Sequence, residues 1–248
     1  MPQHIKKQYW FENWFDSPYY HLLYQHRDKQ EARNFITKLI QLLQLPENST
    51  LLDLACGKGR HSIHFAQNKL LVTGIDLSRQ SIHYAQQFEK ENLSFFMHDM
   101  RNPFRINYFD AVMNLFTSFG YFENENDNLK TLQSATASMK SGGVLVIDFM
   151  NAKKVIRQMK KSESKKIDDI HFHIKKHLEC GFLIKQINFS HNKEEFCFNE
   201  KVKTLELPDF QNYFKQCGLV LSACYGDYQL NAFDEVNSDR LILIARKS

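Results

Sequence analysis

Acidic residues and a glycine-bearing loop are the groups of this sequence whose types and spacing suit the binding of a polar ligand. The alternating residues of the loop are Asp53, Ala55, Gly57 and Gly59, and a helical pattern follows directly from His61. Glycines let the backbone turn tightly and approach a ligand without an intervening Cβ atom. The N–H groups at the start of the helix can then face a polar or anionic group. The loop therefore predicts a nucleotide-like ligand.

Two classes of cofactor use a loop of this kind. Dinucleotide enzymes carry Gly-x-Gly-x-x-Gly, because a pyrophosphate rests on the helix N-terminus. Here the third glycine would fall on Ser62, and the acid at Asp53 is extra to that pattern. S-adenosylmethionine (SAM) has no phosphate, and an acid just before the loop can take its ammonium group, directly or through water. The loop favours SAM over NAD and leaves a nicotinamide oxidoreductase as the disfavoured alternative.

The elements that must position these residues follow from alternating apolar and helical patterns. Apolar runs of strand length recur at residues 51–55, 70–75, 93–97, 111–116 and 144–149, and helical patterns fill 61–68, 80–90 and 126–140. Strands that alternate with helices predict βαβ units and a parallel sheet. We expect an α/β fold: a Rossmann-like, seven-stranded, mostly parallel sheet with helices on both faces and an antiparallel last strand.

The alternation stops after Asn151. The run Lys-Ser-Glu-Ser-Lys-Lys at 161–166 is typical of a solvated linker, and period-two patterns at 170–176, 182–189 and 196–205 predict a small antiparallel β insertion. We expect three parts: an N-terminal helical cap at 1–45, a SAM-binding Rossmann-like domain at 46–160 and 206–248, and the insertion at 161–205 as a lid over an acceptor pocket.

With these motifs in place, the chain resembles the class I SAM-dependent methyltransferases over almost its whole length, including the branch with deoxysugar N-methyltransferases. Asp53 and the glycines match the first motif of that family, with Ala55 in place of its first glycine. Asp76 closes the second strand, 19 residues after Gly57, and matches the ribose-binding acid; Asp99 matches the adenine-binding acid. The resemblance implies cofactor contacts by Tyr20, Asp53, Ala55, Cys56, Gly57, Gly59, Arg60, Asp76, Leu77, Ser78, Asp99, Met100, Asn114, Leu115 and Phe116. S-adenosyl-L-homocysteine would be the product.

Two tyrosines are the catalytic candidates. Tyr20 lies in a segment that resembles the Tyr-Asp-x-Leu-Tyr signature of small-molecule methyltransferases, where it folds over the cofactor. Tyr121 falls where deoxysugar N-methyltransferases carry a histidine, so the change weakens any carry-over of a role as a base. Methyl transfer from a sulfonium needs mainly alignment of the acceptor, and a base only if the acceptor must lose a proton. Core packing by aromatic rings is the alternative for both.

Composition indicates in which compartment the protein works and whether it binds a structural metal. The chain has five cysteines and no Cys-x-x-Cys pair, which favours neither a disulfide framework nor a metal site and suits a reducing compartment. Residues 1–7 precede aromatics and acids rather than an apolar run, which argues against a signal peptide. No stretch approaches the roughly 20 apolar residues of a membrane span. We expect a cytoplasmic protein without a membrane partner.

The acceptor is the least determined part of this interpretation. Residues 151–203 carry 13 Lys and Arg against 7 Asp and Glu, an excess that can attract an acidic acceptor or simply be solvated surface. The fourth strand is followed by Asn114-Leu115-Phe116-Thr117 rather than a base-methylating motif, which disfavours nucleic acid without excluding it. We expect methyl transfer to an N or O atom of a small molecule. RNA or protein methylation and a non-catalytic SAM-binding role stay open, as do a monomer and a homodimer.

Overall fold

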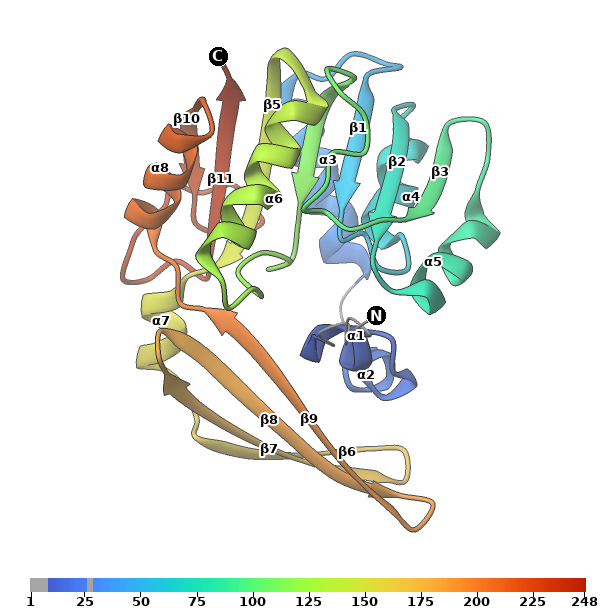
Figure 1. The fold of residues 1–248 in the computed structure, drawn as a ribbon, viewed down its shortest axis with the longest axis vertical. Coiled ribbons are helices and arrows are strands. Elements are labelled where there is room, and N and C mark those ends of the chain that lie inside the picture. The colour runs from blue at the N-terminus through green and yellow to red at the C-terminus, as the bar shows by residue number, and fades with distance from the viewer. Residues whose placement is uncertain (1–8, 26–28) are drawn as a thin grey trace, which may run out of the picture. The chain divides into compact units, whose positions relative to one another are not determined.

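The computed structural model describes residues 9–25 and 29–248, so residues 1–8 and 26–28 lie outside the described part (Figure 1). The chain divides into two units. The larger is Asp28–Met159 with Lys203–Ser248, and the smaller joins Met1–Arg27 to Lys160–Val202. The three parts expected from the sequence, and the role of lid given to one of them, stay predictions.

A seven-stranded sheet forms the centre of the larger unit. Its strands are β1 (Thr50–Leu54), β2 (Leu71–Asp76), β3 (Leu93–Met97), β4 (Phe109–Asn114), β5 (Met139–Met150), β10 (Leu219–Tyr225) and β11 (Arg240–Lys247). The order is β10-β11-β5-β4-β1-β2-β3. The strands β1 to β5 pair in parallel, and β11 is antiparallel to both of its neighbours. The predicted fold class is therefore confirmed.

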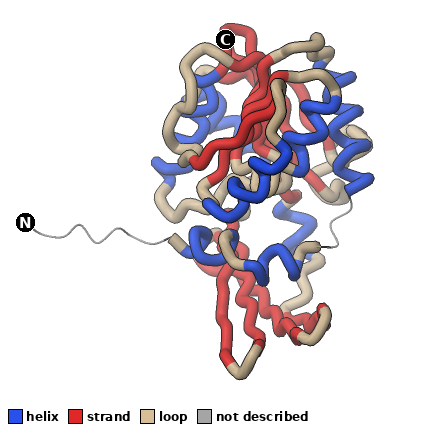
Figure 2. The backbone as a smooth tube through the Cα atoms, turned by 90° about the vertical axis from the view of Figure 1, so that its right-hand side faces the viewer, coloured by secondary structure: helices blue, strands red, loops and turns tan. Residues whose placement is uncertain are grey.

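Helices cover both faces of this sheet (Figure 2). They are α3 (Lys29–Leu43), α4 (Arg60–Gln67), α5 (Arg79–Ala85) with a 3-10 turn at Gln86–Phe88, α6 (Glu125–Ser138) and α8 (Leu207–Gln216). A further short helix, α7 (Ala152–Arg157), directly follows β5. On one face Ile36 and Leu39 of α3 join Phe65 of α4 in the main apolar core. Helices α6 and α8 cover the other face, which is turned toward the viewer in Figure 1. There Phe210 of α8 packs against Phe149 of β5. Two covered faces explain why the central strands are almost continuously apolar.

The smaller unit is a four-stranded sheet with two short helices. Its elements are α1 (Trp10–Phe15), α2 (Pro18–Leu23), β6 (Ser162–Ile167), β7 (Ile170–Glu179), β8 (Phe182–His191) and β9 (Glu194–Lys203). The strand order is β6-β7-β8-β9, with β7 antiparallel to β6 and β8. Trp14 of α1 is buried with Phe172 and Ile187 of the sheet, so an aromatic N-terminal segment and the insertion share one core.

Residues 162–166 of the lysine-rich run belong to β6, so the interpretation of this run as a linker was wrong. The run pairs with β7 from Ser162 opposite Lys175 to Ile167 opposite Ile170. An edge strand tolerates charged side chains, because only one of its sides is paired and solvent reaches the rest. Glu163 also forms a 2.8 Å ion pair with Lys176 of β7, and Ile167 enters the core. The alternation of polar and apolar residues that marks a strand is harder to recognise in an edge strand rich in lysine.

Along the described ranges 9–25 and 29–248, no helix has both the length and the apolar character needed to cross a membrane.

Candidate cofactor site

The loop between β1 and α4 has an alternating left-handed backbone. Its φ angles are 56° at Ala55, 55° at Gly57 and 78° at Gly59. A Cβ atom on Gly59 would lie 2.5 Å from the Phe95 ring, whereas one on Gly57 would meet nothing within 4 Å. Gly59 is therefore required by packing, and Gly57 lies on the open side of the loop. Backbone N–H groups in such conformations form concavities that bind polar or anionic groups.

Asp76 closes this loop from the end of β2. Its Oδ2 accepts a hydrogen bond of 2.8 Å from the N–H of Gly57, and its Oδ1 accepts one of 2.8 Å from the N–H of Ser78. Ser78 in turn caps α5, since its hydroxyl accepts from the N–H of Ser81 at 3.0 Å. A carboxylate has about four lone-pair positions, so each of its oxygens can accept more than one hydrogen bond. Leu77 beside it is exposed and offers an apolar surface.

Asp53 lies inside β1 and is only 1% exposed. Its Oδ2 accepts a 2.5 Å hydrogen bond from the hydroxyl of Ser62. Burial raises the pKa of Asp53 to about 7; the bonds from Ser62 oppose this rise, and the charge of Asp76 adds to it. Ser62, which the sequence showed only as a missing glycine, is thus the partner of this acid.

Cys56, between Asp53 and the glycines, is buried. Burial raises the pKa of its thiol well above the ordinary value, and the nearby charge of Asp76 raises it further. The reactive form of cysteine is the thiolate. A thiol held in its neutral form is a small packing residue of the loop rather than a nucleophile.

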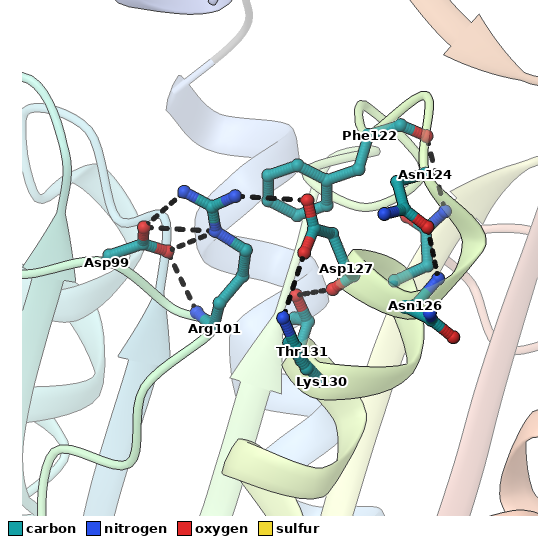
Figure 3. A network of polar contacts seen from close by, with 9 residues as sticks. Asp99, Arg101, Phe122, Asn124, Asn126, Asp127, Lys130 and Thr131 are labelled. Carbon is teal, nitrogen blue, oxygen red and sulfur yellow. Dashed lines mark hydrogen bonds and ion pairs between the residues drawn. The ribbon is translucent and has the colours of Figure 1, made fainter. Parts of the chain in front are cut away.

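Asp99, after β3, belongs to a charged network shown in Figure 3. Its Oδ1 accepts from the Arg101 N–H at 2.9 Å, and its Oδ2 lies 2.6 Å from Nη2 of Arg101. Partial burial raises the pKa of Asp99, but the bonds and charge of Arg101 outweigh it and lower the pKa overall. Arg101 also reaches Asp127 of α6 at 3.2 Å and lies over the Phe122 ring. A role for Arg101 was not predicted from the sequence. The only signal for this residue there was its place two residues after Asp99, which was expected to bind the cofactor.

The segment after β4 supplies the next wall of the site. Asn114 is 2% exposed; its Nδ2 donates to the carbonyl of Ser118 at 3.3 Å, and its Oδ1 has no partner among the described residues. Leu115 is buried and Phe116 is half-buried. The Arg60 guanidinium, at the start of α4, lies 5.1 Å from the centre of the Phe116 ring. A small pocket here is lined by Glu31, Ala32, Phe35, Arg60, His61, Phe116, Asp148 and Tyr228.

The predicted site residues therefore fall into two groups. Residues 53–60, 76–78, 99–100 and 114–116 lie at or just after the carboxyl ends of four neighbouring parallel strands, in the order β4-β1-β2-β3, so they gather at one end of the sheet. Tyr121 joins this group, because its hydroxyl donates to the carbonyl of Thr117. Tyr20 belongs to the smaller unit, where its ring contacts Phe15 and Trp14.

Metal ligands are not part of this arrangement. Within the described residues, no group of three or more His, Cys, Asp or Glu side chains is placed to hold a metal ion.

Comparisons with known proteins agree with this geometry. Residues 45–207 match the family described as a methyltransferase domain. The chain is 28% identical over 225 residues to YqeM of Bacillus subtilis (strain 168), covering 86% of this chain and 89% of that protein. It is 32% identical over 132 residues to dTDP-3-amino-3,4,6-trideoxy-alpha-D-glucopyranose N,N-dimethyltransferase of Streptomyces venezuelae, covering 52% of this chain and 54% of that protein.

A solved structure shares the fold. The S-adenosylmethionine-dependent methyltransferase from Clostridium acetobutylicum ATCC 824 superposes with a TM-score of 0.77 at 19% identity, covering 93% of this chain and 96% of that one. At this identity the likeness concerns the fold alone. Together with the family match over most of the chain, it confirms the family predicted from the motifs. The chain belongs to the methyltransferase domain family and has the fold of a SAM-dependent methyltransferase.

Proposed function

We propose that the protein transfers a methyl group from SAM to an N or O atom of a small molecule. The observation that carries this proposal is the Asp76 carboxylate, held by the N–H groups of Gly57 and Ser78 at the end of β2. A carboxylate at the end of a strand can accept hydrogen bonds from the two adjacent hydroxyls of a ribose. The open side of Gly57 and the Oδ1 of Asn114, which finds no partner in the described part of the chain, fit a ligand with further polar groups.

SAM, when bound, supplies a methyl group already activated on a sulfonium. The protein then has to align the acceptor and exclude water rather than generate a strong nucleophile. In this proposal Asp76 accepts the ribose hydroxyls, Asp99 and the N–H of Met100 hold the adenine, and Arg60 faces the carboxylate. Asp53, directly or through water, and Asn114 take the ammonium group, while Ala55, Cys56, Gly59, Leu77, Leu115 and Phe116 line the site.

Tyr121 and Tyr20 are assigned to the acceptor side. The Tyr121 hydroxyl donates to the Thr117 carbonyl, and a hydroxyl oxygen can accept a hydrogen bond while it donates one. We therefore assign Tyr121 the orientation of an acceptor N–H or O–H rather than removal of its proton. Tyr20 is proposed to close over the cofactor, on the strength of the sequence signature alone.

Amino sugars are the first acceptors to test. The name of the Streptomyces venezuelae relative describes a nucleotide-linked amino sugar as its substrate. An unprotonated amine can be methylated without a strong base. This suits a site in which the candidate for a base is a tyrosine. A panel of nucleotide-linked amino sugars, bulk RNA and cellular protein, each incubated with methyl-labelled SAM, separates the acceptor classes.

Calorimetry with SAM and S-adenosyl-L-homocysteine tests the cofactor. We expect binding in the micromolar range, and Asp76→Ala should weaken it by about 10-fold or more, since hydrogen bonds to a charged group contribute roughly 1.5–3 kcal/mol. Asp110→Asn is the matched control, because Asp110 also accepts a backbone N–H, that of Thr50 at 2.8 Å, but near the start of β4. Binding of NAD by a wild-type protein that ignores SAM would overturn the proposal.

A further inference from the structure

The turn after β4 contains two consecutive residues in the left-handed region. The φ angles are 63° at Phe116 and 59° at Thr117. Neither residue is glycine and Thr117 is β-branched, so this conformation is intrinsically unfavourable for both. Such a turn persists only where the surrounding structure determines it. The contacts that do so come from β5 and β11.

Asp148 of β5 bonds to both peptide groups of the turn. The N–H of Phe116 donates to its Oδ2 at 2.8 Å, and the N–H of Thr117 donates to its backbone carbonyl at 2.8 Å. The Asp148 side chain is only 1% exposed, so water does not compete for these bonds. One residue thus holds two adjacent strained positions.

Arg240 of β11 completes the arrangement. Its Nε donates to Oδ1 of Asp148 at 2.7 Å, and its Nη2 donates to the Thr117 hydroxyl at 2.9 Å. The Tyr228 hydroxyl donates to Oδ2 of Asp148 at 3.1 Å. The carboxylate therefore accepts from a peptide group, a phenol and a guanidinium. A buried ion pair gains little stability over an apolar pair of the same size, so directional bonding to the turn is the feature that distinguishes this one.

The turn in question forms part of the pocket described above. Two guanidinium groups contact the Phe116 ring, with Arg60 at 5.1 Å and Arg240 at 5.8 Å from its centre. Arg60 is the first residue of α4 and follows Gly59 directly. The position of the Phe116 ring therefore links the loop after β1 to the loop after β4.

We infer that Asp148 and Arg240 are positioning residues of the cofactor site, which hold the Phe116–Thr117 turn and so set the pocket wall beside Arg60. They act through the turn and need not touch the ligand. The inference rests on the proposed function, because it assigns this wall to the methionine end of SAM. A purely structural ion pair would instead support the whole domain without a specific effect on the turn.

The experiment compares Asp148→Asn, Arg240→Met and Thr117→Val with the wild type and with the Asp110→Asn control. The first readout is hydrogen exchange of the amides at 116 and 117 in the ligand-free protein. The second is the dissociation constant of S-adenosyl-L-homocysteine. Arg240→Lys keeps the charge, and Thr117→Ser keeps the hydroxyl that accepts from Arg240. Thr117→Val removes only that acceptor, so it remains informative if the ion-pair variants do not fold.

We expect Asp148→Asn and Arg240→Met to speed exchange at the turn and weaken ligand binding, each by about 10-fold, the cost of a lost charged hydrogen bond. Thr117→Val should weaken binding by a smaller factor of about 3, and Thr117→Ser should restore it. Unchanged exchange at 116 and 117, or faster exchange with unchanged binding, would overturn the inference. A wild type that binds no ligand would instead defeat the proposed function, while the exchange readout still decides whether the pair holds the turn.

Discussion

Asp53→Asn is expected to make the protein more stable and less able to bind its cofactor. The substitution is isosteric and keeps an acceptor oxygen for the hydroxyl of Ser62, which lies 2.5 Å from Oδ2. It removes a carboxylate that is almost wholly buried in β1. Because burial opposes ionisation, the wild-type protein carries a free-energy cost whenever this group is charged.

The size of that cost follows from the pKa, which burial raises from 3.8 to about 7. Three pKa units correspond to about 4 kcal/mol, since one unit is about 1.4 kcal/mol. Between these two values the folded state retains a proton that the unfolded state has lost, so the stability of the wild type falls as the pH rises and levels off above about 7. Asparagine does not titrate. The difference between variant and wild type should therefore grow from pH 4 to pH 7 and stay constant above it.

Thermal unfolding at pH 5, 6, 7 and 8 without cofactor measures this difference. After relaxation of the site we expect a gain of about 1–3 kcal/mol at pH 8, or roughly 2–10 °C in Tm for a chain of this length. Asp110→Asn is the opposite control, because Lys140 and Thr50 lower the pKa of Asp110 even though partial burial raises it. That carboxylate stabilises the fold above its ordinary pKa and loses this effect as the pH falls, so its removal should destabilise the protein at pH 8.

The reasoning is refuted if the Asp53→Asn difference is independent of pH, or if the variant is less stable than the wild type at pH 8. The same variant should bind S-adenosyl-L-homocysteine about 10-fold more weakly, as expected for the loss of a charged partner of the ammonium group. Unchanged binding would remove Asp53 from the proposed site while leaving the stability prediction intact.

Three further outcomes test the site and the smaller unit. Ala55→Gly should raise the free energy of unfolding by about 1 kcal/mol, because it relieves a left-handed alanine; no gain in a urea titration would contradict this. Arg101→Gln should weaken ligand binding by about 5-fold or more by freeing Asp99 from its charged partner, whereas equal affinities by calorimetry would limit that pair to a structural role. Glu200→Gln should destabilise the protein by roughly 1–3 kcal/mol because Lys185, 3.4 Å away and largely buried, loses its counter-charge; an unaltered Tm would show that Lys185 finds another partner.

The fold was predictable because its signals are repetitive. Five apolar runs alternating with helical patterns specify a parallel sheet almost regardless of which apolar residues fill them. The places of the Gly57–Gly59 loop and of Asp76 in the fold were predictable for a related reason: a tight turn and a strand end leave few residue types and spacings available. The edge strand β6 was not predicted, because lysines on an exposed edge strand give the same sequence pattern as a solvated segment.

Partners brought together by the fold could not be found in this way. Ser62 is nine residues from Asp53, and Arg240 is 92 residues from Asp148. Nothing in the spacing of either pair marks it, since the contact exists only once β1 meets α4 or β5 meets β11. Arg101 could not be predicted for a different reason. An arginine close after an acid is common on protein surfaces, and only the contacts of Arg101 with Asp127 and Phe122 distinguish it here.

The costly features of the site share one end of the sheet. Asp53 is a buried acid, and Ala55, Phe116 and Thr117 are non-glycine residues in the left-handed region. Each is unfavourable for folding, and each lies at the end of a strand or in a loop that we assign to the cofactor. Local conflict of this kind marks functional sites, where stability is exchanged for geometry. Removal of the buried charge of Asp53 should therefore stabilise the protein at the expense of binding, whereas a stabilised Asp53→Asn variant with full affinity would argue that the ligand does not contact Asp53.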